Sequence, residues 1–185
     1  MGKEFEGKVA IITGSGQGIG HDLAVYMASE GCKIITNNRK KGSSMQAHDG
    51  KVVKLLPEDE VRIKAVIGDA ETCADEIKAA GGEAIPVYGD VSKPEDCKRL
   101  VDAALDAWGH VDIVVNNAAA TWTGNVKDMT VPEWDVNISS KLSGTFYLMH
   151  YALPSMLEHK YGRCVSGSSQ GLFGFAGMAA SSAAS

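Results

Sequence analysis

The stretch VAIITGSGQGIG, residues 9–20, joins a short apolar run to four glycines at alternate positions. The run from Val9 to Thr13 is rich in β-branched residues and predicts a buried strand. Apolar residues then recur at helical spacing, as at Ile19, Leu23 and Met27, until Gly31 marks a stop, so a helix is predicted directly behind the glycines. A tight turn needs only one or two glycines, so the others must make room for something else.

The remainder of the chain repeats this alternation of strand and helix. Ser92 and Thr130 are each followed three residues later by glutamate, which predicts two helices opened by capping boxes, the second continuing to about residue 157. Continuous apolar strands between amphipathic helices are typical of a parallel sheet covered on both faces. We therefore predict one α/β domain over residues 1–185, a doubly wound sheet in three α/β/α layers with strand order 3-2-1-4-5. Besides the first strand, further strands are predicted at residues 33–36, 84–88, 111–115 and 162–166.

The connection between the second and third strands is longer than this fold requires. A strand–helix–strand crossover takes about 30 residues, and the stretch from Asn38 to Asp90 exceeds that length. We therefore predict an insertion at residues 42–68, with a helix beginning near Pro57.

Composition and charge exclude several classes of protein. Hydrophobic residues make up 44% of the chain and charged residues 22%, as in ordinary globular domains. The net charge of −5 argues against nucleic acid as a partner, because proteins that bind it usually carry a basic excess. No stretch is suited to a membrane span or a signal peptide, so no membrane association is expected. The four cysteines are scattered and the histidines are unclustered, which predicts reduced thiols in the cytoplasm and no metal site.

The glycine loop has the pattern T-G-x-x-x-G-x-G rather than the common G-x-G-x-x-G of dinucleotide-binding proteins. In this pattern Gly14 turns the chain, Gly18 lets the backbone approach a pyrophosphate, and Gly20 lets the helix pack closely on the strand. The amino terminus of the following helix would then face the phosphates.

Four motifs occur in order along the chain: TGSGQGIG, Gly89-Asp90-Val91, Asn116-Asn117-Ala118-Ala119 and Ser168-Ser169. As a set they resemble the short-chain dehydrogenase/reductase family, and the resemblance covers essentially the whole chain. It implies a Rossmann-type fold, a nicotinamide cofactor and hydride transfer between a carbonyl and an alcohol. It also implies a small-molecule substrate and a homodimer or homotetramer.

The same resemblance assigns cofactor-binding roles to individual residues. Asp90 would accept a hydrogen bond from the adenine amino group, and Asn116 and Asn117 would support the central strand and the ribose side of the cofactor. The further residues expected at the cofactor are Gly14, Ser15, Gln17, Gly18, Ile19, Gly20, Val91 and Ala118.

The end of the second strand bears on the choice between NAD and NADP. NAD enzymes tend to place an acidic residue there to bind the ribose 2′-hydroxyl, and the corresponding residue here is the neutral Asn38. Arg39 follows it, and arginine can hold a 2′-phosphate through two hydrogen bonds. We therefore predict NADP, with NAD as the alternative. Two observations oppose this: Arg39, Lys40 and Lys41 could form a solvated loop, and Gln17 is neutral where many NADP-dependent relatives carry a basic residue.

The catalytic pattern of the family departs from its usual residues in this chain. The family uses a serine, a tyrosine and a lysine, with an asparagine assisting. Ser181 occupies the tyrosine position and Ser185 the lysine position. The active serine is Ser169 when counted forward from Gly162-Arg163 and Ser168 when counted back from residue 181, so both remain candidates. Lys141 stands at the asparagine position, where it could reach the site or be a solvated helix lysine.

Two functions are compatible with this sequence. The first is an NADP(H)-dependent oxidoreductase whose catalytic region, near the end of the chain, is incomplete relative to the family. The second is a non-catalytic dinucleotide-binding module that has lost the acid–base pair. The true residues at positions 181 and 185, and whether further chain follows them, discriminate between the two functions, because general acid–base catalysis depends on those side chains.

Overall fold

The computed structural model of the chain describes residues 3–43, 68–120, 122 and 124–185. The predicted insertion at residues 42–68 lies outside the described residues except at its two ends, and so does the helix expected near Pro57.

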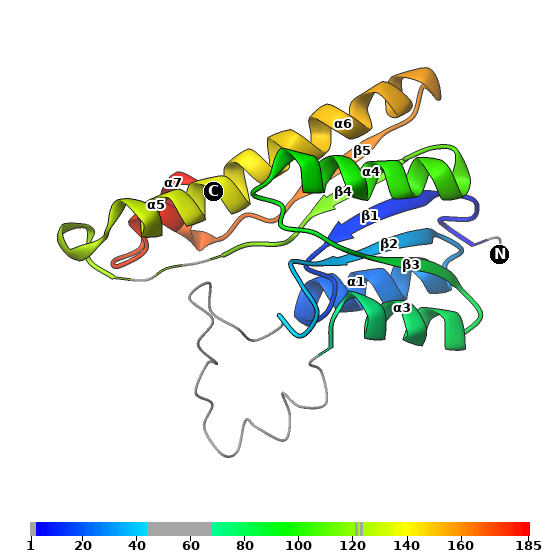
Figure 1. Ribbon diagram of the computed structural model, residues 1–185, viewed down its shortest axis with the longest axis horizontal. Helices are drawn as coiled ribbons and strands as arrows, with labels where there is room; N and C mark the ends of the chain where they lie inside the picture. The colour runs from blue at the N-terminus through cyan, green and yellow to red at the C-terminus, as the bar shows by residue number, and fades with distance from the viewer. Residues whose placement is uncertain (1–2, 44–67, 121, 123) are drawn as a thin grey trace, which may run out of the picture.

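Five strands form one parallel sheet in the order β3-β2-β1-β4-β5 (Figure 1). The predicted strand order is confirmed, and the glycine loop leaves the central strand. Ile11 at the middle of β1 pairs with Ile35 on one side and Val114 on the other. The strands are β1 (Val9–Thr13), β2 (Lys33–Asn38), β3 (Glu83–Tyr88), β4 (Ile113–Asn116) and β5 (Arg163–Ser166).

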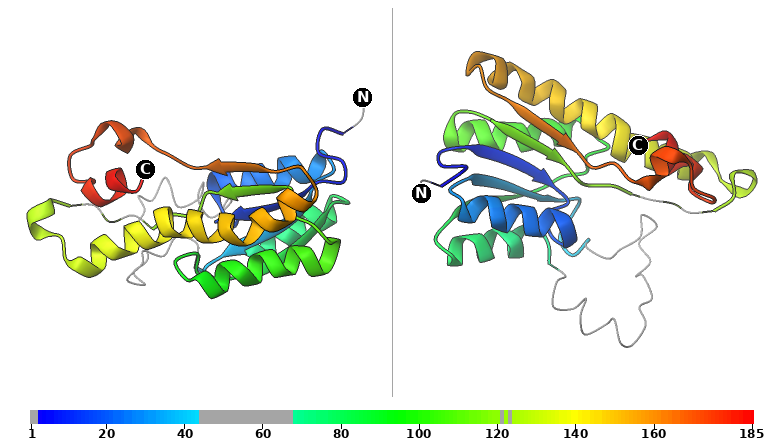
Figure 2. Two further views of the ribbon diagram at one scale, coloured as in Figure 1. Left: turned by 90° about the horizontal axis from the view of Figure 1, so that it is seen from above. Right: turned by 180° about the vertical axis from the view of Figure 1, so that it is seen from behind.

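Helices cover both faces of the sheet, as the continuous apolar strands predict (Figure 2). α1 (Gly18–Ser29) and α3 (Ala70–Ala79) lie on one face, and α4 (Pro94–Trp108) and α6 (Gly144–Glu158) lie on the other. The shorter helical elements are η1 (Val126–Asp128), α5 (Val131–Asn137), η2 (Ile138–Ser143), η3 (Gln170–Phe173) and α7 (Ala179–Ala183).

Alternate residues of β1 contribute to two separate hydrophobic clusters. Val9 and Ile11 pack in the cluster beneath α4 and α6, whereas Ala10 and Ile12 pack in the cluster beneath α1 and α3. All four side chains are completely buried. Burying an aliphatic side chain of valine or isoleucine size contributes about 1.5–3 kcal/mol, so the layer on each side anchors the central strand.

Three details of the predicted elements are wrong. The capping box at Ser92 does not form, because the Ser92 hydroxyl donates to Asp90 Oδ1 (2.7 Å) and α4 begins one residue later than that cap would place it, after Lys93. The strand expected at residues 111–115 begins at Ile113. Ile19, expected on the apolar face of α1, is 74% exposed.

The capping box at Thr130 is confirmed, since the Glu133 carboxylate accepts from the Thr130 amide (2.7 Å). The helical stretch that it opens ends at Glu158, close to the predicted end. This stretch is not one α-helix, because η2 between α5 and α6 is a π-helix. A π-helical turn changes the facing of the residues within it and is often found at functional sites.

Candidate functional site

The predicted site residues gather at one edge of the sheet, where its parallel strands end (Figure 1). The glycine loop follows β1, Asn38 ends β2, Asp90 follows β3 and Asn116 ends β4. Ligands of open parallel sheets bind beyond this edge. The edge is therefore the place to look for a binding site.

The Thr13 hydroxyl joins the ends of the two central strands. Its oxygen accepts hydrogen bonds from the amides of Asn117 and Ala118, both at 3.0 Å, and donates to the Val115 carbonyl at 3.3 Å. The Asn117 side chain also bonds to this strand end, since its Nδ2 donates to the carbonyls of Thr13 (2.9 Å) and Gly14 (3.3 Å). Thr13 is 1% exposed, so its hydroxyl is shielded from water. They fix where the glycine loop begins.

Gly20 brings the start of α1 against this contact. A Cβ atom at Gly20 would lie 2.5 Å from Asn117 Nδ2 and 2.5 Å from the Gly14 carbonyl oxygen, which no side chain can tolerate. Gly14 has φ +65°, a left-handed conformation that glycine adopts without strain. The close packing expected of Gly20 and the turn expected of Gly14 are both found.

Gly18 opens the loop toward solvent at the amino end of α1. Its φ is +55°, and a Cβ atom there would meet nothing within 4 Å. The N-cap residue Gln17 supplies no side-chain hydrogen bond, and the first turn of α1 holds no acidic residue. The amides of this first turn and the positive end of the helix dipole are thus available to an anion such as a pyrophosphate.

Ser15 and Gly16 connect the glycine loop to β2 and to residues 68–69. The Ser15 hydroxyl accepts from the Asn37 amide (2.8 Å), and the Ser15 amide donates to the Asn37 carbonyl (3.0 Å). The Gly16 carbonyl accepts from the Gly68 amide (2.9 Å), and a Cβ atom at Gly16 would lie 2.6 Å from Asp69 Cα. The Ser15 side chain therefore joins the loop to β2, and its expected role at the cofactor stays a prediction. The role of Gly16 was missed, although a fourth glycine in the loop was a signal for it.

Asn37 is a second residue that sequence reasoning missed. Its side chain is buried, and its Nδ2 donates to the carbonyls of Val87 (3.1 Å) and Gly89 (3.1 Å). It therefore holds the end of β2 against the end of β3, next to Asp90. An asparagine at a strand end is also an ordinary turn former, so the sequence carried no distinctive signal.

Asp90 is oriented by its own turn. Its Oδ1 accepts from the Ser92 amide (3.0 Å) and hydroxyl (2.7 Å), and its amide donates to Asp96 Oδ2 (2.7 Å). Val91, expected at the cofactor, is 7% exposed and packs in the core beneath α4 and α6. A Cβ atom at Gly144 would lie 2.8 Å from the Val91 carbonyl oxygen, so Val91 also positions the start of α6.

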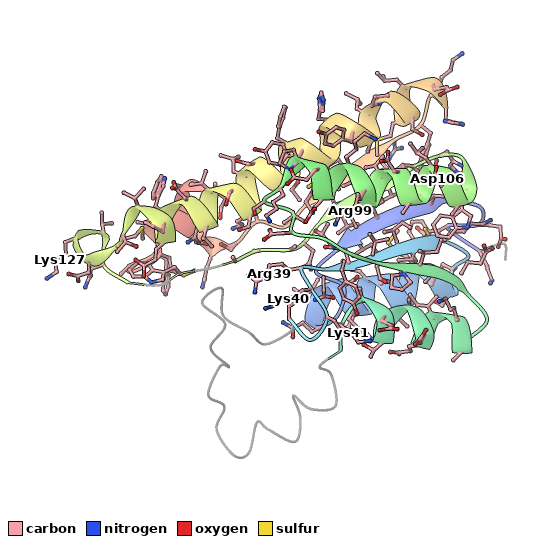
Figure 3. All side chains as sticks on the ribbon, in the orientation of Figure 1. Arg39, Lys40, Lys41, Arg99, Asp106 and Lys127 are labelled. Carbon is pink, nitrogen blue, oxygen red and sulfur yellow. The ribbon has the colours of Figure 1, made fainter. Side chains whose placement is uncertain are left out.

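The three basic residues after β2 differ in their surroundings. Figure 3 shows Arg39 and Lys40 extending beyond the end of β2, whereas Lys41 lies near the start of α3. Lys41 forms an ion pair with Glu71, and the hydrogen bond that it donates raises the pKa of Lys41 above its ordinary value. Asn38 is buried. Arg39 and Lys40 are the members of the cluster that extend toward a ligand at this edge.

The carboxylate of Asp69 caps the amino end of α3. Burial alone would raise the pKa of Asp69, but hydrogen bonds from the amides of Thr72, Gly42 and Glu71 outweigh it and lower the pKa. Asp69 is the N-cap of α3, with Thr72 completing the capping box. The negative charge near Gly16 is therefore engaged by backbone amides.

The two candidate serines follow β5 and are both exposed. Ser169 caps η3, since its hydroxyl accepts from the Gly171 amide (3.1 Å). A Cβ atom at Gly171 would lie 3.0 Å from Ser169 Oγ and 3.4 Å from Ser182 Oγ, so α7 packs close behind this turn. Ser169 thus has a defined orientation beside α7.

Lys141, Ser181 and Ser185 are brought together. Lys141 Nζ donates to Ser185 Oγ at 2.6 Å, and Ser185 Oγ donates to the Ser181 carbonyl at 2.8 Å. Ser181 is 4% exposed and Lys141 is half-buried, so Lys141 is not a fully solvated helix lysine. The residues at the family's asparagine, tyrosine and lysine positions therefore form one cluster, between η2 and α7.

Several other kinds of site are absent from the described part of the chain. Within residues 3–43, 68–120, 122 and 124–185, no three His, Cys, Asp or Glu side chains are grouped so as to hold a metal ion. Burial raises the pKa of the thiols of Cys32, Cys73 and Cys97 to about 12, which keeps them protonated. None of the helices in these ranges is both long and apolar enough to cross a membrane.

The chain is similar in sequence and in fold to known proteins. The family described as short chain dehydrogenase matches residues 50–184. Peroxisomal multifunctional enzyme A of Dictyostelium discoideum is 32% identical over 97% of this chain and 36% of its own length. An uncharacterized oxidoreductase of Thermotoga maritima is 33% identical over 92% of this chain and 57% of its own length. The crystal structure of a short chain dehydrogenase from Mycobacterium avium has a TM-score of 0.78 at 29% identity and covers 97% of this chain and 59% of that one.

The Thr13 contact can be tested by substitution. Thr13→Val keeps the shape of the side chain but leaves the buried amides of Asn117 and Ala118 without their acceptor. We expect the free energy of unfolding, measured by urea titration, to fall by about 1–3 kcal/mol. Thr145→Val on α6 is the matched control, because the Thr145 hydroxyl only donates to the carbonyl of Lys141. Equal small losses in both variants would contradict the role given to Thr13.

Proposed function

Because the chain belongs to the short-chain dehydrogenase/reductase family, we propose that it is an NADP(H)-dependent oxidoreductase that interconverts a carbonyl and an alcohol. The observation that carries the proposal is the open loop at Gly18, placed before the amino end of α1 by the packing of Gly20 against Asn117. The chain spans about a third of the Dictyostelium relative and just over half of the Thermotoga relative.

The residues present fit a nicotinamide dinucleotide. The open space at Gly18 and the first amides of α1 would hold the pyrophosphate, and Asp90, oriented by Ser92, would accept from the adenine amino group. Asn117 and Ala118, held by Thr13, would line the ribose side. When bound, the nicotinamide supplies or accepts the hydride.

The preference for NADP over NAD rests on the end of β2. Asn38 carries no charge that would repel a 2′-phosphate, and Arg39 extends beyond the strand. Lys41 is paired with Glu71, and the carboxylate of Asp69 is engaged by backbone amides. This arrangement favours Arg39 as the residue that binds the 2′-phosphate.

We expect Arg39→Ala to weaken NADPH binding by about 10- to 100-fold, since it removes a charge-assisted contact, and to leave NADH binding unchanged. Isothermal titration calorimetry with both nucleotides measures this. Asn38→Asp should partly invert the preference, and Lys127→Ala, at an exposed lysine on η1, is the control. Equal affinities for the two nucleotides, unchanged in Arg39→Ala, would contradict the NADP preference while leaving dinucleotide binding intact.

The catalytic residues of the family can be restored in this chain. Ser185→Lys alone would place a second ammonium beside Lys141, so we combine Lys141→Asn, Ser181→Tyr and Ser185→Lys. We expect this triple variant to reduce ketones about 10²–10⁴-fold faster than the single variant Lys141→Asn, which has neither the lysine nor the tyrosine; this is the usual contribution of general acid–base catalysis. The measurement is NADPH consumption across a panel of ketones.

The gain in the triple variant should disappear on replacing Ser168 or Ser169 with Ala, whichever holds the carbonyl oxygen. Nucleotide binding without turnover in every variant would instead indicate a non-catalytic dinucleotide-binding module. In that case the family's fold would be retained without its chemistry.

A second copy of the chain is the proposed partner, as a homodimer or homotetramer. Leu142 of η2 and Phe146, Leu153 and Leu157 of α6 are 53%, 62%, 43% and 68% exposed. Their spacing places them along one side of the helical stretch, and a two-fold axis would pair this stripe with itself. Sedimentation should give a multiple of 19.5 kDa that falls to the monomer in Phe146→Asp. A monomeric parent would contradict the proposal.

The cytoplasmic location of this chain stays a prediction, and the Dictyostelium relative carries a peroxisomal name.

A further inference from the structure

Lys141 is a cation whose surroundings in the described residues lack a counter-charge. It belongs to the π-helical turn η2 and is half-buried. Its ammonium donates to the neutral Ser185 hydroxyl at 2.6 Å, and among the residues that the structure describes no carboxylate forms an ion pair with it. Six of the other described lysines pair with a carboxylate, and Lys3, Lys40, Lys93 and Lys160 do not; what distinguishes Lys141 is its hydrogen bond to Ser185 within the cluster between η2 and α7.

The π-helical turn is held by the loop that follows β4. The Ala120 amide donates to Ser140 Oγ (3.2 Å), and the Trp122 amide donates to Asn137 Oδ1 (3.4 Å). Asn137 is 1% exposed and Ser140 is 9% exposed, so both accepting residues are buried. The turn that carries Lys141 is therefore tied to the same strand end as Asn117, at the edge of the sheet where the substrate is expected.

The hydrogen bonds around Lys141 leave donors on its ammonium. An ammonium has three N–H donors, and Ser185 takes one of them. Ser185 does not neutralise the charge of Lys141, because its hydroxyl is uncharged and its own proton is donated to the Ser181 carbonyl. Removing a charge from water is costly unless a partner compensates it, so this position favours a ligand atom that carries or develops negative charge.

We propose that Lys141 is the proton donor of this chain and that its ammonium binds the carbonyl oxygen of the substrate. This inference rests on the proposed function, because hydride addition to a carbonyl requires a proton at oxygen. As the new C–H bond forms, the C=O π electrons move to oxygen and the N–H bond of Lys141 breaks toward that oxygen. The products are the alcohol, the oxidised nicotinamide and a neutral amine, which takes a proton from water. An ammonium is a much stronger acid than the hydroxyl of Ser181 or Ser185, so it takes this role.

The experiment separates binding of a carbonyl from proton transfer to it. The binding probe is isobutyramide, whose carbonyl accepts hydrogen bonds but is not reduced, titrated calorimetrically into the NADPH-loaded chain. Turnover is measured on the same ketone panel. The variants are Lys141→Met, which removes the charge, and Lys141→Arg, which keeps the charge but cannot release a proton. Lys127→Met is the control, because Lys127 lies at the exposed tip shown in Figure 3 and pairs with Asp128 rather than with the cluster.

We expect Lys141→Met to lose both amide affinity and turnover by about 10- to 100-fold, as for a charge-assisted hydrogen bond. Lys141→Arg should retain amide binding within a few-fold and lose turnover. NADPH affinity and the thermal midpoint should match the parent in both variants, which separates this role from a structural one.

Three results would overturn the proposal. The first is amide binding and turnover in Lys141→Met equal to those of the parent. The second is full turnover in Lys141→Arg, which would make the charge rather than the proton the relevant property. The third is a parent chain that binds NADPH but neither binds the amide nor reduces any ketone. If the triple variant of the previous section is then active, the proposed function stands and only the role of Lys141 fails.

Discussion

The hydroxyl of Thr13 makes three hydrogen bonds across the two central strands, and the geometry of the whole binding edge follows from them. They place Asn117 against the start of the glycine loop, and Asn117 in turn leaves no room for a side chain at Gly20. The amino end of α1 can therefore lie directly over the end of β1, with its first amides facing open space at Gly18. A small buried hydroxyl thus determines where an anion can approach the backbone.

The sequence predicted elements well where one local pattern decides the structure, and less well where a distant residue does. β1 was predicted to the residue because an apolar β-branched run ends at a glycine. The strand near residue 113 starts later than predicted, where the Asp112 carboxylate accepts from the Val9 amide (2.9 Å), a contact 103 residues apart in sequence. The cap at Ser92 failed because Asp90 competes for its hydroxyl. A single π-helical turn inside a long helical stretch has no residue signature of its own, so η2 could not be predicted.

The same distinction applies to the site. Gly14 and Gly20 were given their roles correctly because a strand, a turn and a helix follow one another there. Ser15, Gly16 and Asn37 act through contacts with β2, β3 and the chain at residues 68–69, which are adjacent only after folding. Their hydrogen bonds join the layers that local patterns predict separately. A motif therefore identifies the loop, and the folded chain decides which of its side chains remain available to a ligand.

The binding edge and the catalytic cluster differ in how they are held. Residues of the glycine loop are fixed by hydrogen bonds to Asn37 of β2, to Asn117 after β4 and to Gly68. Ser181 and Ser185, by contrast, lie in and just beyond α7, a helix of five residues. Phe173 and Phe175, on the segment leading to α7, are 89% and 54% exposed, so few apolar contacts stabilise that segment. Lys141, by contrast, extends from a helical stretch that is tied to the end of β4 through Ser140 and Asn137. A proton donor must be held in position relative to the cofactor to be effective. Of the charged and hydroxyl groups in this cluster, Lys141 is the one whose helical turn is bonded to the loop that leaves the sheet after β4.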